Sequence, residues 1–384
     1  MRTLFVVAGE VSGDLLAAPL IEVLLRRDPE LQVVGIGGAR MAAAGCRVLQ
    51  DSTTWGAIGY VDPILHLRAY LRRLRAVVTA IRRAHPALLL LVDFPAFNLR
   101  VAERLRGHIP AVYYFPPLVS VRRGDRAALV AALGMRLLAT LRREEEAYRR
   151  AGADVVFIGH PIVDLAVPRR SAAQIHDAFG IPPGVPVVGL LPGSREQEIR
   201  QHLRVMLAAA ARVKARRADV RFLVPVAAPP LRPAVEGALR GSPVPAQAVD
   251  SSQEVMTVST VLVTATGTAT LEAALLGVPM VAVYRLPWPG MVIARRLVSV
   301  RFAALPNLLA DREIVPELLQ ERMTPDAIAA EVLGLLDDPA RREAMRADLR
   351  GVAAGLGPSG ALERAADEVM RALAVALPQR SGAG

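Results

Sequence analysis

Short runs of hydrophobic residues alternate with longer stretches of helical character along most of the chain. The runs are hydrophobic at consecutive positions rather than at every second one, which is typical of parallel strands buried on both faces of a sheet. The first half contains the runs Thr3–Ala8, Gln32–Gly37, Ala87–Asp93, Ala111–Phe115 and Asp154–Ile158. The second half contains Val187–Leu191, Val220–Val226, Ala246–Val249, Thr260–Thr266 and Pro279–Tyr284. Strands that alternate with helices predict right-handed βαβ units, and therefore an α/β protein with doubly wound parallel sheets.

The strand pattern is interrupted once, which predicts two Rossmann-like domains. The interruption is the segment Val167-Pro168-Arg169-Arg170-Ser171, and a chain of 384 residues is long for one ordinary domain. We place the first domain at residues 1–167 and the second at residues 168–357. A helix over residues 358–377 is expected to pack back towards the first domain, and residues 378–384 are expected to form a frayed tail. Two such domains facing a cleft form the GT-B arrangement, in which ligands bind beyond the carboxyl ends of the strands.

The composition of the chain indicates which classes of partner it can bind and in which compartment we expect it. The formal net charge is +11, which favours anionic partners such as phosphorylated metabolites and anionic lipid surfaces. Nucleic acid is not expected, because no aromatic platforms interleave with the basic residues and no nucleic-acid-reading motif is present. The single cysteine, Cys46, excludes an intramolecular disulfide and a metal site of several thiolates. The sequence shows no signal peptide and no uninterrupted apolar run of about 18 residues, so we expect a cytoplasmic protein.

A turn of the phosphate-binding type follows the first strand of the second domain. The string Leu191-Pro192-Gly193-Ser194-Arg195 lies between that strand and a predicted helix. Gly193 and Ser194 let backbone N–H groups approach a ligand closely at a helix N-terminus, and Arg195 adds a planar charged group for phosphate oxygens. An ordinary strand–helix turn with a surface arginine has the same pattern.

A second turn of this kind lies in the string Thr264–Glu272, again between a strand and a helix. Gly267 and Thr268 could present N–H groups and a hydroxyl to a diphosphate, and Glu272, one helical turn further on, could accept both ribose hydroxyls. The alternative is a helix capped by threonine, with a first-turn glutamate favoured by the helix dipole. Two such turns in one domain favour a nucleotide site.

Polar and acidic residues follow two strands of the first domain. Glu10, Ser12, Gly13 and Asp14 lie in the loop after the first strand, and Asp93 ends the third hydrophobic run in the string VDFPAFN. A carboxylate at such a strand end would face the cleft, where it could deprotonate an attacking hydroxyl. The alternatives are that Asp14 is only a first-turn helix acid and that Asp93 only caps the next helix.

Five strings resemble those of the lipid-A-disaccharide synthase family: AGEVSGDLLAAPLI, GIGGARMAAAGC, LLPGSREQEI, GTATLEAALLGVPMVAVYR and LPNLLADREIVPELLQ. The resemblance is closest over residues 183–330, and it implies that the nucleotide is UDP. It places Thr268 and Thr270 at the phosphates and Glu272 at the ribose. The donor-site residues that it implies are Gly193, Ser194, Arg195, Gly267, Thr268, Thr270, Glu272 and Asn307. His160, in the string FIGHPIVD, also matches a family motif, and its role could be structural or catalytic.

The reaction that the resemblance implies assigns roles to both halves. UDP-2,3-diacylglucosamine donates its sugar to the 6-hydroxyl of 2,3-diacylglucosamine 1-phosphate, and a β-1,6 bond replaces an α bond, so the configuration inverts. Direct displacement needs a base, for which the family motif favours Asp93. It also needs stabilisation of the leaving UDP, by Arg195, the threonines and the helix N-termini. No cofactor is implied, and the sequence contains no Asp-x-Asp pair to hold a metal ion, so we expect metal-independent transfer.

Three places depart from the family pattern on the acceptor side. Ala96 replaces a second aspartate, and Arg142-Arg143-Glu144 replaces Pro-Phe-Glu. In the segment 115–123, Pro116 stands where the family motif begins with serine, and both tryptophans of that motif are missing. These departures leave the acceptor open. The alternatives are a relative with another lipid or glycan acceptor, a non-catalytic UDP-sugar binder and a sugar-nucleotide epimerase, since epimerases can have the same two-domain fold.

The segment Ile64–Ile81 predicts a basic amphipathic helix. Its hydrophobic stripe comprises Ile64, Leu67, Leu71, Leu74, Val78 and Ile81, and its flanking arginines include Arg68, Arg72 and Arg75. Such a helix can lie on an anionic membrane surface, although a core-facing helix with a solvated arginine face has the same pattern. Because the family takes a lipid acceptor, we expect peripheral association with the cytoplasmic surface of the inner membrane. The sequence gives no oligomeric state.

Overall fold

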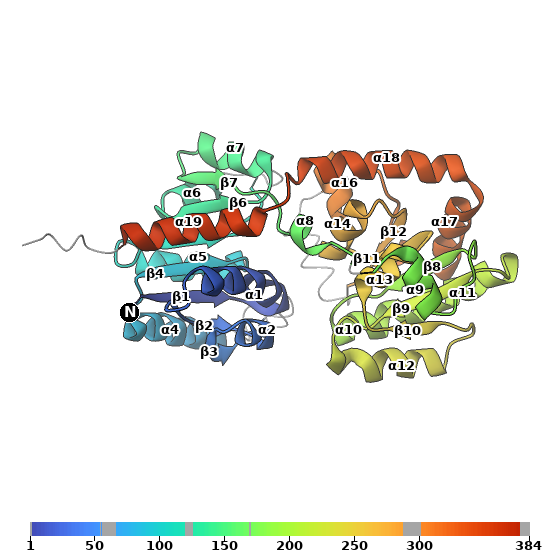
Figure 1. Cartoon of the computed structure of the whole chain (residues 1–384), viewed down its shortest axis with the longest axis horizontal. Coiled ribbons are helices and arrows are strands. Elements are labelled where there is room, and N and C mark those ends of the chain that lie inside the picture. The colour runs from blue at the N-terminus through green and yellow to red at the C-terminus, as the bar shows by residue number, and fades with distance from the viewer. Residues whose placement is uncertain are drawn as a thin grey trace, which may run out of the picture. The chain divides into compact units, whose positions relative to one another are not determined.

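The computed structural model describes residues 2–53, 55, 67–119, 126–168, 170–286 and 301–376, which form two compact α/β units (Figure 1). Among these residues, the first unit comprises those up to Asp164 and those from Leu356 onwards. The second unit comprises those from Leu165 to Gly355. The described chain therefore leaves the first unit, forms the second and returns to the first for its last helix.

The first unit is built on a parallel sheet of seven strands in the order β3-β2-β1-β4-β5-β6-β7. The strands are β1 (Thr3–Ala8), β2 (Gln32–Gly37), β3 (Arg47–Asp51), β4 (Leu88–Val92), β5 (Ala111–Tyr114), β6 (Arg136–Ala139) and β7 (Val155–Phe157). The order reverses between β1 and β4, so the sheet is doubly wound, as predicted. Such a reversal point is where α/β sheets bind ligands.

Helices cover both faces of this sheet. They are α1 (Glu10–Arg27), α2 (Ala39–Ala43), α4 (Leu67–Ala84), α5 (Pro95–Leu105), α6 (Arg126–Ala131), α7 (Arg142–Arg150), α8 (Ile162–Leu165) and α19 (Ala361–Val375). In β1, Leu4 and Val6 pack in the core formed with α1 and α19, whereas Phe5 and Val7 pack in the core formed with α4 and α5. Each of these four side chains is at most 1% exposed. Burial on both faces explains why the strands are hydrophobic at consecutive positions.

The last helix, α19, belongs to the first unit although it follows the second unit in the sequence (Figure 1). Arg27 of α1 forms ion pairs with Glu363 and Asp367 of α19. The carboxylate of Asp164 accepts a hydrogen bond from the backbone N–H of Gly360 at 2.6 Å, immediately before the helix begins. These contacts join the two ends of the described chain within one unit.

The second unit has a parallel sheet of six strands in the order β10-β9-β8-β11-β12-β13. The strands are β8 (Val187–Leu191), β9 (Arg221–Pro225), β10 (Gln247–Val249), β11 (Val261–Ala265), β12 (Met280–Tyr284) and β13 (Glu317–Leu319). The helical segments are α9 (Ala172–Ala178), α10 (Glu196–Glu198), the π-helix η1 (Ile199–Leu203), α11 (Arg204–Arg216), η2 (Pro229–Leu231), α12 (Arg232–Arg240), α13 (Ser252–Val258), α14 (Thr268–Leu275), α16 (Leu305–Ala310), η3 (Gln320–Arg322), α17 (Pro325–Asp337) and α18 (Pro339–Gly355). The order reverses between β8 and β11, so this sheet is also doubly wound.

All ten predicted hydrophobic runs form strands, each within one residue of its expected bounds. Three strands were not predicted, namely β3, β6 and β13. The predicted fold class, with two Rossmann-like parallel sheets, is confirmed.

Candidate active site

The carboxyl ends of β1 and β4 lie side by side in the first unit. Their register pairs Ala8 with Val92, so the residues that follow the two strands lie at one edge of the sheet. Glu10 begins α1 just after β1, and Asp93 directly follows β4. The structure thus brings together the two loops in which the sequence predicts acidic site residues.

Backbone strain is concentrated at this edge. Seven non-glycine residues in the described part of the chain have positive φ, and four of them follow β1, β4 or β5: Glu10 (63°), Asp93 (49°), Phe94 (49°) and Phe115 (59°). Each such conformation costs about 1–3 kcal/mol and persists only where the surroundings impose it. Residues of this kind cluster at active sites, so the strain makes this edge a candidate active site.

Hydrogen bonds fix the backbone of Asp93. Its carbonyl oxygen accepts from Asn98 Nδ2 at 2.8 Å and from the Tyr113 hydroxyl at 2.9 Å. Asn98 is fully buried, and its Nδ2 also lies 3.2 Å from the carbonyl oxygen of Val7 in β1. Asn98 and Tyr113 are therefore supporting residues that the sequence interpretation missed, although Asn98 ends the VDFPAFN string.

The side chain of Asp93 is partly buried and receives a hydrogen bond from Ser12 Oγ, 3.1 Å from Oδ2. Burial raises the pKa of Asp93 above its ordinary value, and hydrogen bonds from the Phe94 backbone and from Ser12 oppose this shift. The helix-cap alternative receives no support, because the N-cap residue of α5 is Phe94 and no side chain caps the helix. A carboxylate of raised pKa, oriented by one hydroxyl, can act as a general base.

Asp14 has a different environment from Asp93. Its carboxylate accepts backbone N–H bonds from Gly38 at 2.8 Å, Met41 at 2.9 Å and Arg40 at 3.1 Å, at the start of α2. The side chain is 3% exposed. Asp14 was expected in the cleft with Glu10, but this carboxylate caps the neighbouring helix instead. Gly13, also buried, lies close against Ala8 of β1.

His160 is a buried, neutral residue of the first unit. Its Nδ1 accepts a hydrogen bond from the backbone N–H of Ile162 at 3.1 Å, and its ring packs edge-on against Phe115 with centroids 5.3 Å apart. Burial lowers the pKa of His160 to about 4. These contacts favour the structural role over the catalytic one.

Two segments that depart in part from the family pattern contact each other, through residues that match it. Glu144, in the Arg142–Glu144 segment, is 2% exposed and accepts a hydrogen bond from the backbone N–H of Val119 at 2.7 Å. The Tyr148 hydroxyl of the same helix donates to the carbonyl oxygen of Pro117 at 2.8 Å. Residues 120–123 of the altered segment lie outside the described residues. The two segments therefore pack together through Val119 and Glu144.

In the first donor turn, after β8, the backbone N–H groups donate to a carboxylate of the protein itself, that of Glu198. Gly193 has φ +126°, and Glu198 Oε2 accepts the backbone N–H groups of Ser194 at 2.9 Å and Arg195 at 3.2 Å. The side chain of Arg195 is 53% exposed. The N–H groups that we expected to face a phosphate thus bind Glu198 in this structure, a residue that the sequence interpretation did not single out. Its position three residues after Arg195, as in a capping box, is the signal that could have found it.

The second donor turn opens α14. Gly267 has φ +139°, which requires glycine, while no described atom lies within 4 Å of the position that a Cβ would take. Thr268 is exposed, whereas the hydroxyl of Thr270 is buried and donates to the Gly267 carbonyl oxygen at 2.6 Å. Burial raises the pKa of Glu272, and a hydrogen bond with Gln253 opposes this shift. Thr268 and Glu272 remain candidates for ligand contact, whereas the Thr270 hydroxyl stabilises the turn.

Asn307, expected near the donor, has its polar side-chain atoms engaged within the protein. Its Nδ2 donates to the Val315 carbonyl oxygen and to Glu317 Oε1, both at 2.8 Å. Its Oδ1 accepts the backbone N–H groups of Ile314 at 2.7 Å and Val315 at 2.9 Å. Asn307 is 0% exposed. Its side chain is therefore committed to holding the loop between α16 and β13.

The amphipathic helix α4 directs much of its hydrophobic stripe to the core. Leu74, Val78 and Ile81 are at most 6% exposed and pack against the sheet. Leu71 is half-buried, while Arg68, Arg72 and Arg75 are exposed. Ile64 and the side chain of Leu67 lie outside the described residues. The stripe thus follows the core-packing alternative, and the arginines form the solvent-facing side.

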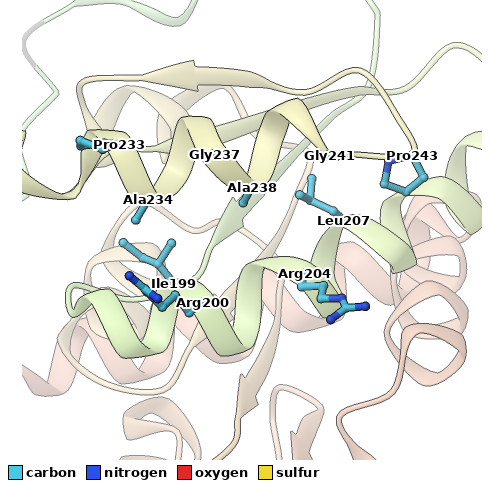
Figure 2. Close-up of a pocket in the computed structure, with 10 residues that line it drawn as sticks. All are labelled: Ile199, Arg200, Arg204, Leu207, Pro233, Ala234, Gly237, Ala238, Gly241 and Pro243. Carbon is cyan, nitrogen blue, oxygen red and sulfur yellow. The ribbon is translucent and has the colours of Figure 1, made fainter.

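A separate groove of about 420 Å³ lies in the second unit between α12 and the segment η1–α11 (Figure 2). It is mainly apolar, with Ile199, Leu207 and Ala238 among its lining residues, and Arg200 and Arg204 also line it. None of the residues that the sequence predicts for the site line this groove.

The described residues contain neither a cluster of metal-ligating side chains nor a helix that could span a membrane. No group of three or more His, Cys, Asp or Glu side chains in them is placed to hold a metal ion. None of their helices has both the length and the apolar character needed to span a bilayer.

Comparison with known proteins identifies a family. The family model described as lipid-A-disaccharide synthetase matches residues 4–365. The lipid-A-disaccharide synthase of Geobacter sulfurreducens is 37% identical over 96% of this chain and 97% of its own. That of Anaeromyxobacter dehalogenans is 40% identical over 96% of each chain.

Solved structures of other enzymes have the same fold. The UDP-GlcNAc 2-epimerase of Neisseria meningitidis, bound to UDP-GlcNAc, has a TM-score of 0.64 and 12% identity, over 97% of this chain and all of the other. A calicheamicin glycosyltransferase has a TM-score of 0.59 and 19% identity, over 98% of this chain and all of the other. At this identity the likeness extends to the fold, which is GT-B.

Proposed function

The chain belongs to the lipid-A-disaccharide synthase family, and from this premise we propose how its residues carry out the transfer. The protein is a glycosyltransferase that joins UDP-2,3-diacylglucosamine to 2,3-diacylglucosamine 1-phosphate, giving the lipid A disaccharide and UDP. Family membership supports the reaction. The surroundings of Asp93 support its assignment as the general base of that reaction.

Asp93 acts as the general base on the acceptor. Its carboxylate takes the proton of the acceptor 6-hydroxyl as that oxygen bonds to the anomeric carbon, and the bond from this carbon to the UDP oxygen breaks. The configuration inverts in this single displacement. The observation that carries this role is a partly buried carboxylate of raised pKa at a strained strand end, held by Ser12.

The donor is received by the two turns of the second unit. The guanidinium of Arg195 stabilises the charge that develops on the departing diphosphate. The hydroxyl of Thr268 and the N-terminus of α14 bind the phosphates, since the positive end of a helix dipole favours anions. Glu272 accepts the ribose hydroxyls. Thr270 and Asn307 support these segments from within the protein.

Membrane contact is electrostatic in this proposal. Arg68, Arg72 and Arg75 are exposed on α4, while the opposite face of the helix is buried in the core. Anionic headgroups attract such arginines without insertion of apolar side chains. The protein would thus approach its lipid acceptor at the cytoplasmic surface of the inner membrane.

Product analysis tests the reaction. The purified chain is incubated with the UDP-diacylglucosamine donor and the 1-phosphate acceptor, and the lipids and nucleotides are identified by mass spectrometry. We expect the disaccharide 1-phosphate together with UDP. A changed UDP-sugar without a glycoside would indicate an epimerase, and unaltered substrates would indicate a non-catalytic binder. If UDP is released only when a different acceptor is supplied, the chain is still a UDP-sugar transferase, but the proposed acceptor is wrong.

A further inference from the structure

The carboxylate of Glu198 joins two strand ends of the second unit. In addition to the two backbone N–H groups of the donor turn, it accepts hydrogen bonds at Oε1 from Arg195 Nη1 at 3.3 Å and from the Tyr284 hydroxyl at 3.1 Å. The side chain of Glu198 is 14% exposed. Four donors therefore converge on one carboxylate, and one of them is the guanidinium proposed to bind the diphosphate.

The shape of the turn matches this carboxylate. A Cβ on Gly193 would lie 2.2 Å from Glu198 Oε2, and the φ of Gly193, +126°, is one that other residues rarely adopt. Any side chain at position 193 would displace the carboxylate. Glu198 is thus part of the turn, in a space that only glycine leaves open.

The bridge made by Glu198 crosses the edge of the sheet at which the donor is proposed to bind. Tyr284 is the last residue of β12, and β11 lies between β12 and β8 in the sheet. The second donor turn, at Gly267, begins just after β11. Glu198 therefore ties the ends of the two strands that flank this second turn.

His202 makes a second bridge between the same strand ends. Its Nδ1 lies 2.7 Å from the carbonyl oxygen of Pro192, and its Nε2 accepts the backbone N–H of Arg285 at 3.2 Å. Nε2 also lies 3.3 Å from the carbonyl oxygen of Arg285, so both ring nitrogens have backbone partners. His202 is 0% exposed. The π-helix η1 follows Glu198 and contains His202, and π-helical turns recur at functional sites.

We propose that Glu198, supported by His202, is a positioning residue for donor binding. It holds the Arg195 guanidinium and the Gly193–Arg195 turn in the arrangement that receives the donor diphosphate, without touching the donor itself. Because Arg195 is already held, less of its rotamer freedom is lost when the donor binds. This proposal rests on the proposed function, since the donor is taken to be a UDP-sugar.

Calorimetry with UDP on Glu198→Gln tests the role. The amide keeps the size of the carboxylate but has one acceptor oxygen, so it cannot accept hydrogen bonds on both sides. We expect the Kd for UDP to rise about ten- to a hundredfold. The control is Glu196→Gln on the same short helix, where Glu196 is 58% exposed and pairs only with the surface residue Arg200 at 2.6 Å. The control should bind UDP as the wild type does.

A double-mutant cycle separates positioning from general stabilisation. If Glu198 acts largely through Arg195, then Arg195→Ala combined with Glu198→Gln loses clearly less UDP affinity than the product of the two single fold-changes, the remainder being the effect of Glu198 on the turn backbone. Fold-changes that multiply in the double variant would show that Glu198 acts independently of Arg195, which overturns the proposal. Tighter UDP binding by Glu198→Gln would also overturn it, because the carboxylate would then be a competitor of the phosphate.

A second variant tests the proposal if Glu198→Gln does not fold. Should thermal melting show that Glu198→Gln is unfolded, Tyr284→Phe removes one donor to Glu198 and is expected to weaken UDP binding by about threefold or more. Unchanged UDP affinity in Tyr284→Phe would then contradict the bridge. A wild-type chain that binds no UDP contradicts the proposed function itself. Wild-type and Glu198→Gln chains that bind UDP equally contradict only the positioning role.

Discussion

Asp14 and Asp93 have different surroundings although each lies near the carboxyl end of a strand in the same sheet. The carboxylate of Asp14 accepts three backbone N–H bonds from residues 24 to 27 positions later, whereas that of Asp93 accepts one side-chain bond, from Ser12. The sequence predicts both as strand-end acids. It does not predict the partners, because these come from distant loops that the fold brings close. The carboxylate of Asp93 lacks such a set of three backbone donors, as the proposed base role requires.

The pH dependence of stability should reveal the burial of His160. Its pKa in the folded protein is about 4, below the ordinary value of about 6.5, so the unfolded chain binds the proton more readily. The stability that this provides is complete above pH ~6.5 and is lost as the pH falls towards ~4, by about 3 kcal/mol at most.

Denaturant unfolding across this pH range measures the effect. His160→Asn, which keeps an acceptor for the Ile162 N–H, should show a shallower fall in the free energy of unfolding than the wild type. Identical slopes in the two proteins would argue against a buried, neutral histidine.

Arg195 and Glu272 are the side chains on which UDP affinity should depend. Loss of one charge-assisted hydrogen bond costs roughly 1.5–3 kcal/mol, so Arg195→Ala and Glu272→Ala should each weaken UDP binding about tenfold or more. Titration calorimetry is the measurement, with Arg200→Ala as the control, since Arg200 is an exposed arginine of η1 paired with Glu196. Wild-type affinity in both variants would remove the donor-site assignment.

At the scale of elements, the strands that the sequence predicts most clearly are the central ones that are buried along almost their whole length, namely β1, β4, β8 and β11. The missed strand β3 has the sequence RVLQD, and four of its five residues are exposed, so it lacks a hydrophobic run. β6 and β13 have four and three residues, but β5 and β7 are equally short and were predicted, so length alone does not explain why β6 and β13 were missed. Such strands are recognised by their partners in the sheet rather than by local composition.

The two donor turns differ in how much of their structure the sequence contains. The glycines at 193 and 267 predict unusual backbone conformations, and both have positive φ. The occupant of the first turn was not predicted, because a capping-type spacing and a phosphate-type turn look alike in sequence. Asn307 is likewise buried by the loop that folds over it. The hydrophobic periodicity of the sequence does not predict where this loop lies.

The helix α4 should bind anionic membranes through charge alone. Replacing Arg68, Arg72 and Arg75 with Gln should lower binding to anionic vesicles about tenfold or more, with the larger loss at low salt. Vesicle sedimentation is the measurement. The matched control replaces Arg204, Arg216 and Arg240 with Gln. These arginines are exposed in the second unit, and their replacement changes the net charge by the same amount. If the two triple variants lose vesicle binding equally, α4 has no specific role in membrane binding and is only a structural helix.

At the scale of the whole molecule, the chain contains both the acceptor-side and donor-side residues of the proposed reaction. The order of hydrophobic runs was sufficient to predict two doubly wound sheets, since the central strands β1, β4, β8 and β11 are buried along almost their whole length. The neighbouring positions of Val119 and Glu144 could not be predicted, because they depend on tertiary packing between segments 25 residues apart.

Transfer should not require a metal ion. The sequence lacks an Asp-x-Asp pair, and Arg195 with the start of α14 offers positive charge and helix-dipole stabilisation for a leaving diphosphate. Turnover should therefore be the same in EDTA as in buffer. Loss of activity in EDTA with recovery on addition of magnesium would show that a metal takes part.

The turnover of Asp93→Asn is the measurement that tests the proposed reaction most directly. Asparagine keeps the size of the side chain but cannot take a proton, and a general base contributes about 10²–10⁴-fold to rate. With the UDP-diacylglucosamine donor and the 1-phosphate acceptor, we expect the variant to form disaccharide slower by that factor, with UDP affinity and Tm near those of the wild type. Turnover within a few-fold of the wild type would contradict the assignment of Asp93 as the base.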